Sequence, residues 1–354
     1  MSSTRPVACR ICISKVGSRC QRPRGTLLGR VCRLGTGATL LAIVALVCGC
    51  NGAGSPPTGW GSLPSDLTFF VTSDTHFTDA GCPNPARAAI QAMNTKVIGQ
   101  PNPAEPGSVI ETPSFVVTCG DLADGGAILP ATDAPNLLGS ANYTDEWNGF
   151  NAHFPLRGVQ GDINKLPFPN YATGGNHDHY RLIGTIGTGT STYVAERLCE
   201  RHAANVTDSG NVYYSFDANG VHVVMLGRWA DETVCRWLQD DLRAVGPNVP
   251  VVLCLHYSFN DGQLWWTDAE RQKLADAITG YRIVAIVHGH THVAQIYRWK
   301  GYDCFDDGTT GKKGEFGVMH ITASSLSYAE YRATYDASGN WTGGAWTHTF
   351  RKAL

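Results

Sequence analysis

Several features are scarce or missing in this 354-residue sequence, and each absence narrows its classification. The apolar run ATLLAIVALV, residues 38–47, is too short for a membrane-spanning helix, which needs about 20 residues. Residues 1–50 contain no Asp or Glu, so the rest of the chain holds 20 of the 28 basic residues against all 30 acidic ones. This acidic remainder offers no evident basic patch for nucleic acid. No internal repeat and no second domain boundary are visible in the sequence.

The first 50 residues predict an export signal. Eight Lys or Arg residues precede the apolar run, which has the length of the hydrophobic region of a secretory signal. The stretch from Val47 to Cys50 resembles a bacterial lipoprotein box, which implies lipidation of Cys50 and a membrane-anchored protein facing the periplasm or the cell exterior. An ordinary cleaved signal peptide and an uncleaved anchor are the alternatives. No Arg-Arg pair favours twin-arginine export.

Residues 51–65, NGAGSPPTGWGSLPS, are rich in Gly, Pro and Ser and predict a flexible linker. Residues 66–354 form the expected folded domain, for which 43% apolar residues supply a large core. Strand-length apolar runs alternate with helical segments over the first two-thirds of the chain, and mostly strands follow. This order predicts a layered α/β body with a mixed sheet or a pair of sheets. Residues 122–145 show little periodicity and predict a long surface loop.

Polar side chains follow five of the apolar runs, at the point where each predicted strand ends. The groups are Asp74 and His76, Asp121, Asn176 to Asp178, His256, and His290 with His292. Because groups after the carboxyl ends of strands in an α/β sheet converge on one edge, we expect these side chains to meet at a single site.

A pair of divalent cations explains the residue types at this edge. Two cations held about 3.5–4 Å apart need a shared anionic ligand, several neutral imidazoles and further oxygen donors. Asp121 is the natural bridge between them. Asp74, His76 and one His of the last motif can complete one site, and Asn176, His256 and the other His can complete the second. This donor set favours Mn, Fe or Zn over Ca or Mg.

The motifs D-x-H, G-D, G-N-H-D, a separate His and G-H-x-H occur here in that order, over residues 67–298. In this the sequence resembles the calcineurin-like metallophosphoesterases. The resemblance implies a four-layer α/β/β/α sandwich of mixed β-sheets flanked by helices. It also implies two ligand sets, the first made of Asp74, His76, Asp121 and His292, and the second of Asp121, Asn176, His256 and His290.

His177 is the expected catalytic residue, either as the acid that protonates the leaving oxygen or as a donor to the phosphoryl group. A metal-bound hydroxide would be the attacking group. We expect Asp124 to orient His177, Asp178 to have a supporting structural role, and His179 to reach the substrate. Trp265 and Trp266 either form a wall of the site or pack beneath a loop.

Two branches of the family are matched incompletely. The stretch from Gly120 to Gly126 lacks the Arg that clamps phosphate in protein Ser/Thr phosphatases. Purple acid phosphatases have Tyr at the position of Asp124 and Gly at that of His76. We therefore expect a dinuclear-metal-dependent phosphoric ester hydrolase acting on a phosphorylated small molecule, with monoesterase and diesterase activity both open. The alternative is a non-catalytic metal- or ligand-binding surface lipoprotein on the same fold.

Overall fold

In the computed structural model, the described residues are 66–78, 80–124, 143–178, 180–182, 189–191, 193–207, 210–262 and 265–354. The predicted signal segment with Cys50, the predicted linker, most of the 122–145 loop and His179 lie outside these ranges. The domain boundaries therefore remain predictions. Within the described ranges, no helix has both the length and the apolar character needed to cross a membrane.

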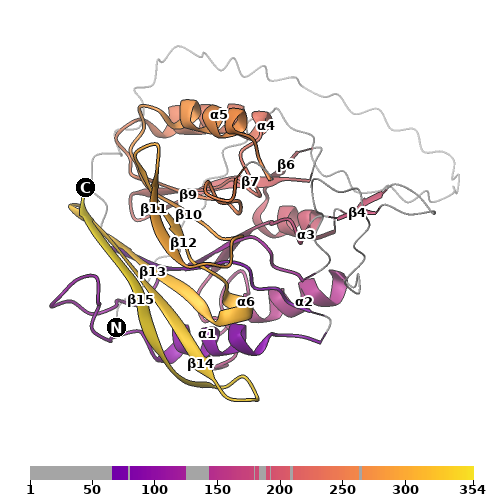
Figure 1. Cartoon of the computed structure of the whole chain (residues 1–354), viewed down its shortest axis with the longest axis vertical. Coiled ribbons are helices and arrows are strands. Elements are labelled where there is room, and N and C mark those ends of the chain that lie inside the picture. Colours follow the sequence, from indigo (N-terminus) through magenta and orange to yellow (C-terminus); the bar gives the residue numbers. More distant parts are fainter. Residues whose placement is uncertain are drawn as a thin grey trace, which may run out of the picture.

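Two mixed β-sheets stack on each other in the middle of the fold (Figure 1). The six-stranded sheet has the order β15 (Trp341–Ala353), β14 (Ser325–Tyr335), β13 (Glu315–Ile321), β1 (Leu67–Thr72), β2 (Val116–Cys119), β3 (Asn170–Thr173). The seven-stranded sheet has the order β11 (Gln295–Trp299), β12 (Tyr302–Asp306), β10 (Ile283–His288), β9 (Val251–Cys254), β8 (Val221–Met225), β7 (Val212–Ala218), β6 (Asn205–Val206). A separate hairpin joins β4 (Tyr180–Leu182) and β5 (Gly189–Ser191).

Helices cover the outer face of each sheet. Figure 1 shows α4 (Glu232–Val245) and α5 (Asp268–Ile278) on one side of the stacked sheets and α1 (Asn84–Thr95) and α2 (Tyr143–His153) on the other. The core of the six-stranded sheet's outer face also includes α3 (Tyr193–His202), and the short helix α6 (Thr310–Lys313) packs against α1. These four layers confirm the predicted α/β/β/α fold.

The alternation of side chains along the strands explains the layering. In β1, Leu67, Phe69 and Val71 enter the core between the sheets, whereas Phe70 enters the core under the helices. Because successive side chains of a strand point to opposite faces, a strand covered on both faces is mostly apolar along its length. All six residues of β1 are buried accordingly.

Parallel pairing places the functional strand ends together. Strands β1, β2 and β3 pair in parallel in one sheet, and β9 and β10 pair in parallel in the other. The carboxyl ends of each set therefore lie at one edge. All the polar motifs found in the sequence follow directly after these five strands.

His222 in β8 joins two elements through two carboxylates. Its Nδ1 lies 2.7 Å from Asp217 of β7, and its Nε2 lies 2.8 Å from Asp241 of α4. Burial alone would lower the pKa of His222, but the two carboxylates outweigh burial and raise it to about 9.

We expect this contact to stabilise the fold in a pH-dependent way. The pKa of His222 in the folded protein lies above its value in the unfolded chain. Its contribution to the free energy of unfolding is therefore complete below about pH 6.5 and is lost as the pH rises through about 9. The amount by which the unfolding free energy of wild type exceeds that of His222→Asn should shrink by about 3 kcal/mol between pH 6 and pH 10. Urea unfolding at several pH values measures this difference. An advantage that stays constant with pH would contradict it.

Candidate metal centre

The polar groups at the five strand ends meet in two clusters that share one carboxylate. The first cluster consists of Asp74, His76, Asp121 and His292, and the second includes Asp121, His256 and His290. Within each cluster the ligand atoms lie within 4.8 Å of one another. Asn176 joins the second cluster, since its Oδ1 lies 3.0 Å from Nε2 of His256. The structure thus brings together all seven side chains that the sequence suggested as metal ligands.

Backbone strain is concentrated at these residues. Of the eight non-glycine residues with positive φ in the described ranges, five belong to the clusters, namely Asp74 (φ 50), His76 (φ 46), Asp121 (φ 50), His290 (φ 77) and His292 (φ 57). Left-handed backbone costs a non-glycine residue energy and collects at functional sites. Main-chain hydrogen bonds from Asp74 to Gly120 (2.9 Å) and from His76 to Asp121 (3.0 Å) hold two of these conformations.

In the first cluster, ring nitrogens and a carboxylate oxygen that can each act as an acceptor face each other. The Nε2 atoms of His76 and His292 are 3.1 Å apart, and Nε2 of His292 is 3.0 Å from Oδ1 of Asp74. Among the described residues, no donor with hydrogen-bond geometry reaches this buried Oδ1. Buried lone pairs that converge without a donor are costly, and a positive charge between them would relieve that cost. A cation fits this cluster.

The second cluster has the same character. Nδ1 of His256 lies 2.8 Å from the main-chain oxygen of Cys119, to which it donates a proton. In the neutral ring, Nε2 therefore carries a lone pair, and it faces Oδ1 of Asn176 at 3.0 Å and Oδ1 of Asp121 at 3.2 Å. Three acceptors thus converge here as well, and the residues present fit a cation.

The electrostatics of the clusters agree with this geometry. Burial alone would lower the pKa of His76 and of His256, but neighbouring carboxylates raise these pKa values to about 9 and about 10. Burial alone would raise the pKa of Asp74, whereas the neighbouring imidazoles hold it well below its usual range. The site therefore stabilises positive charge at the positions where cations would sit.

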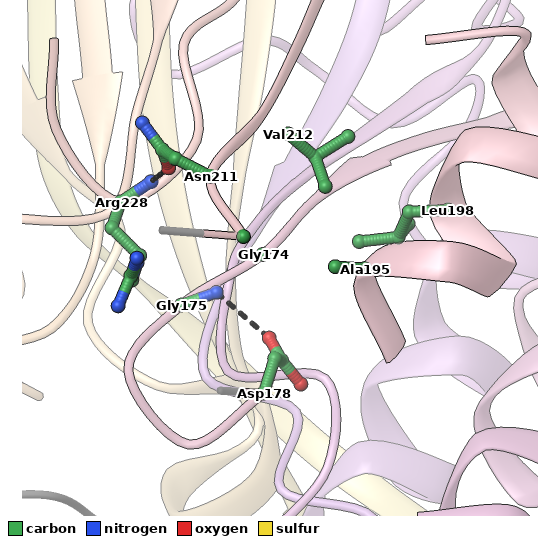
Figure 2. A pocket seen from close by; sticks show the side chains of 9 residues that line it. Gly174, Gly175, Asp178, Ala195, Leu198, Asn211, Val212 and Arg228 are labelled. Atoms are coloured by element: carbon green, nitrogen blue, oxygen red, sulfur yellow. Dashed lines mark hydrogen bonds between the residues drawn. The ribbon is translucent and has the colours of Figure 1, made fainter. Parts of the chain in front are cut away.

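Asp178 fastens the Gly175 to Asp178 turn to the loop after β2. Its carboxylate accepts the N–H groups of Gly175 (2.8 Å), Leu122 (3.0 Å) and Ala123 (2.9 Å), and the first of these bonds is drawn in Figure 2. Burial and the charge of Asp121 raise the pKa of Asp178 to about 6. The adjacent cavity, which Arg228 also lines, has a volume of about 10 Å³ and admits at most one water. This is the supporting role expected for Asp178.

His177 stands at the edge of the clusters with its side chain 19% exposed. Its main-chain N–H donates to Oδ1 of Asp121 at 2.8 Å, and its ring packs edge-on against His76 with centroids 4.7 Å apart. Its Nε2 lies 3.9 Å from Oδ2 of Asp121. The residue is thus fixed beside the shared carboxylate and still open to solvent.

Asp124 lies beside two imidazoles. Its Oδ1 is 3.0 Å from Nδ1 of His76, and its main-chain oxygen is 3.3 Å from Nδ1 of His177. Because Nε2 of His76 faces the cluster, the outer nitrogen of this ring gains from a carboxylate partner. The Asp124 carboxylate is thus placed to orient His76, and the orientation of His177 by Asp124 stays a prediction.

The loop after β9 encloses His290 with aromatic rings. Trp265 meets the His290 ring edge-on at 4.5 Å between centroids, and Tyr257 meets it at 4.8 Å. Trp266 is only 1% exposed, and its Nε1 donates to the main-chain oxygen of Ser258 at 2.9 Å. Of the two roles considered for these tryptophans, Trp265 forms a wall of the site and Trp266 packs beneath the loop.

Sequence reasoning missed Lys312 in α6. This helix is bonded to the end of β1, because Gly311 N–H and Thr309 Oγ1 both donate to the main-chain oxygen of Asp74, at 2.9 and 3.0 Å. Nζ of Lys312 thereby lies 3.5 Å from Nδ1 of His292. The stretch DGTTGKKG, residues 307–314, shows no helical or strand periodicity. The feature that could have pointed to Lys312 is a pair of lysines after a glycine in a short polar stretch.

The chain is similar to a known protein family and to several known proteins. The family model described as calcineurin-like phosphoesterase matches residues 67–294. Among curated proteins, purple acid phosphatase 23 of Arabidopsis thaliana is 28% identical over 201 residues, 51% of this chain and 41% of that protein. Purple acid phosphatase 21 of the same plant is 31% identical over 163 residues, 44% of this chain and 35% of that protein. The chain thus matches less than half the length of these relatives.

Among solved structures, that of PhoD superposes with a TM-score of 0.53 at 11% identity, covering 83% of this chain and 70% of that one. At this identity the likeness concerns the fold alone. The similarity to purple acid phosphatases exists although His76 and Asp124 differ from the residues expected in that branch.

Gly175 offers a test of how closely the loops must approach. A Cβ at this position would lie 2.2 Å from Oδ1 of Asp121, whereas a Cβ at Gly174 would meet only Leu198 and Asp178, at 3.7 and 3.8 Å. Gly175→Ala should lower the unfolding free energy by about 1–3 kcal/mol, and Gly174→Ala should change it by less than about 1 kcal/mol. Urea denaturation of both variants measures this. Equal changes in unfolding free energy for the two variants would contradict the idea that the close approach to Asp121 requires glycine at position 175.

Proposed function

Because the chain belongs to the calcineurin-like phosphoesterase family, we propose that it hydrolyses phosphate esters with the help of two divalent cations. The observation that carries this proposal is the pair of donor clusters that share Asp121, each with converging lone pairs. The purple acid phosphatase homologues favour the same reaction class.

In this proposal each cation has its own set of ligands. Asp74, His76 and His292 would hold one cation, Asn176, His256 and His290 would hold the other, and Asp121 would bridge the two. Imidazole, carboxylate and amide donors suit Mn, Fe or Zn. When bound, such cations polarise a phosphoryl oxygen and lower the pKa of a coordinated water toward about 7.

His177 would act on the substrate from the exposed side of the shared carboxylate. Its partial exposure leaves the ring accessible, and its N–H bond to Asp121 fixes the backbone. A donor at this place can protonate the leaving oxygen or hydrogen-bond to the phosphoryl group. Lys312, beside His292, adds a positive charge at the rim that suits an anionic substrate.

The N-terminal segment supports a further part of the proposal. The basic residues, the apolar run and the Val47 to Cys50 stretch favour an exported lipoprotein tethered through Cys50 by a flexible linker. The enzyme would then meet its substrate outside the cytoplasm.

Replacement of His177 tests the proton-donor role. His177→Gln should lower kcat about 10²–10⁴-fold with bound metal unchanged. The loss should be larger for phenyl phosphate than for 4-nitrophenyl phosphate, because 4-nitrophenolate leaves with little need of a proton. Steady-state kinetics with added Mn²⁺, run in parallel on mono- and diesters, measures both effects and separates monoesterase from diesterase activity.

Two results would count against the proposal. Unchanged turnover in His177→Gln would remove His177 from the mechanism. A wild-type protein that binds two cations but cleaves none of these esters would favour the non-catalytic alternative.

Replacement of Cys50 tests the membrane tether. In a bacterial host, wild type should fractionate with membranes and incorporate labelled fatty acid, whereas Cys50→Ser should do neither. Cys48→Ser is the matched control, and it should behave as wild type. Membrane association of both variants would contradict lipidation at Cys50.

A further inference from the structure

We propose that Asp261 is a positioning residue that orients the imidazole of His290 toward the second cation. No sequence motif singled out Asp261, which lies in the loop after β9. The inference rests on the proposed dinuclear centre and assigns a supporting group to one of its ligands.

Two of the other three imidazoles, His76 and His256, show the pattern that Asp261 would extend to His290. His76 has Asp124 at its outer nitrogen, 3.0 Å away, and His256 has the main-chain oxygen of Cys119, 2.8 Å away. In each ring this outer contact leaves the inner nitrogen free to carry a lone pair into the cluster. Metal-binding histidines almost always have such a partner, which fixes the tautomer and the ring orientation.

For His290 the corresponding partner is Asp261. Oδ2 of Asp261 lies 3.4 Å from Nε2 of His290, and the two side chains are 14% and 8% exposed. Within the described part of the chain, this Oδ2 is buried and has no hydrogen-bond partner. A buried carboxylate oxygen without a donor is costly. A proton on Nε2 of His290 would supply that donor after a small reorientation of the ring, and it would leave Nδ1 for the cation.

The position of Asp261 is set by a rigid anchor in α5. Arg271, which is 6% exposed, contacts the other oxygen of Asp261 at 3.3 Å and donates to the main-chain oxygen of Gly262. Its guanidinium also lies over the ring of Trp266, 5.4 Å from the centroid. One carboxylate oxygen is thus held by α5, and the other points to His290.

Aromatic rings shelter the contact. Trp265 and Tyr257 pack against the His290 ring. Because polar contacts strengthen where water is excluded, this enclosure increases the influence of Asp261 on His290. The carboxylate should make His290 a better oriented ligand, an effect that typically amounts to about 10–100-fold in metal affinity.

The experiment is a titration of chelator-stripped full-length protein with Mn²⁺, followed by calorimetry and by elemental analysis of bound metal. Wild type should bind two ions. In Asp261→Asn, the ion held by His256 and His290 should bind about 10–100-fold more weakly. The ion held by His76 and His292 should bind with unchanged affinity. The matched control is Asp268→Asn, which also removes a carboxylate 3.3 Å from Arg271 but is exposed in the first turn of α5. It should bind both ions as wild type does.

The outcomes separate the inference from the proposed function. A wild type that does not bind two ions would defeat the dinuclear proposal itself. Two ions bound with wild-type affinity by Asp261→Asn would overturn the role of Asp261 alone. Equal weakening in Asp268→Asn would also overturn it, because the effect would then come from Arg271 and the loop.

A second measurement needs no variant and so does not depend on a variant that folds. Long-range ¹H–¹⁵N spectra of zinc-loaded wild type report which nitrogen of His290 carries the proton. The inference expects the proton on Nε2. A proton on Nδ1 would overturn it.

Discussion

The structure depends on one electrostatic constraint, which is that several buried lone pairs must share positive charge around Asp121. Imidazole nitrogens and amide or carboxylate oxygens point toward each other at about hydrogen-bond distance, as between His76 and His292 (3.1 Å) and between His256 and Asn176 (3.0 Å). Without a cation this arrangement leaves polar groups desolvated and unsatisfied. The raised pKa values of His76 and His256 show likewise that positive charge is favoured at this site. The fold therefore maintains a site whose groups are not satisfied by the protein alone.

Other features follow from bringing five chain segments to one point. Ligand residues adopt left-handed backbone because the chain must turn sharply at the strand ends, and main-chain hydrogen bonds hold those turns. Gly175 is needed where one loop passes against Asp121. Asp178 ties these two loops together, and two sheets covered on both faces provide a rigid support. The strain at the site is thus offset by packing elsewhere.

Much of this arrangement could be predicted from the sequence. Strands buried on both faces are continuous apolar runs, so β1 and β9 and the residues that follow them were recognisable. The order of the motifs identified the residues that meet at the edge. Partners set by tertiary packing were not predictable. The Asp124 carboxylate lies against His76, and Asp261 and Lys312 reach the site from a loop and a four-residue helix without periodicity.

The most direct test of the account is an anomalous diffraction experiment on crystals of the metal-loaded wild-type protein. The account predicts two anomalous peaks about 3.5–4 Å apart, with a carboxylate oxygen of Asp121 within bonding distance of both. A single peak, or peaks away from Asp121, would contradict the dinuclear centre on which the proposed hydrolase depends.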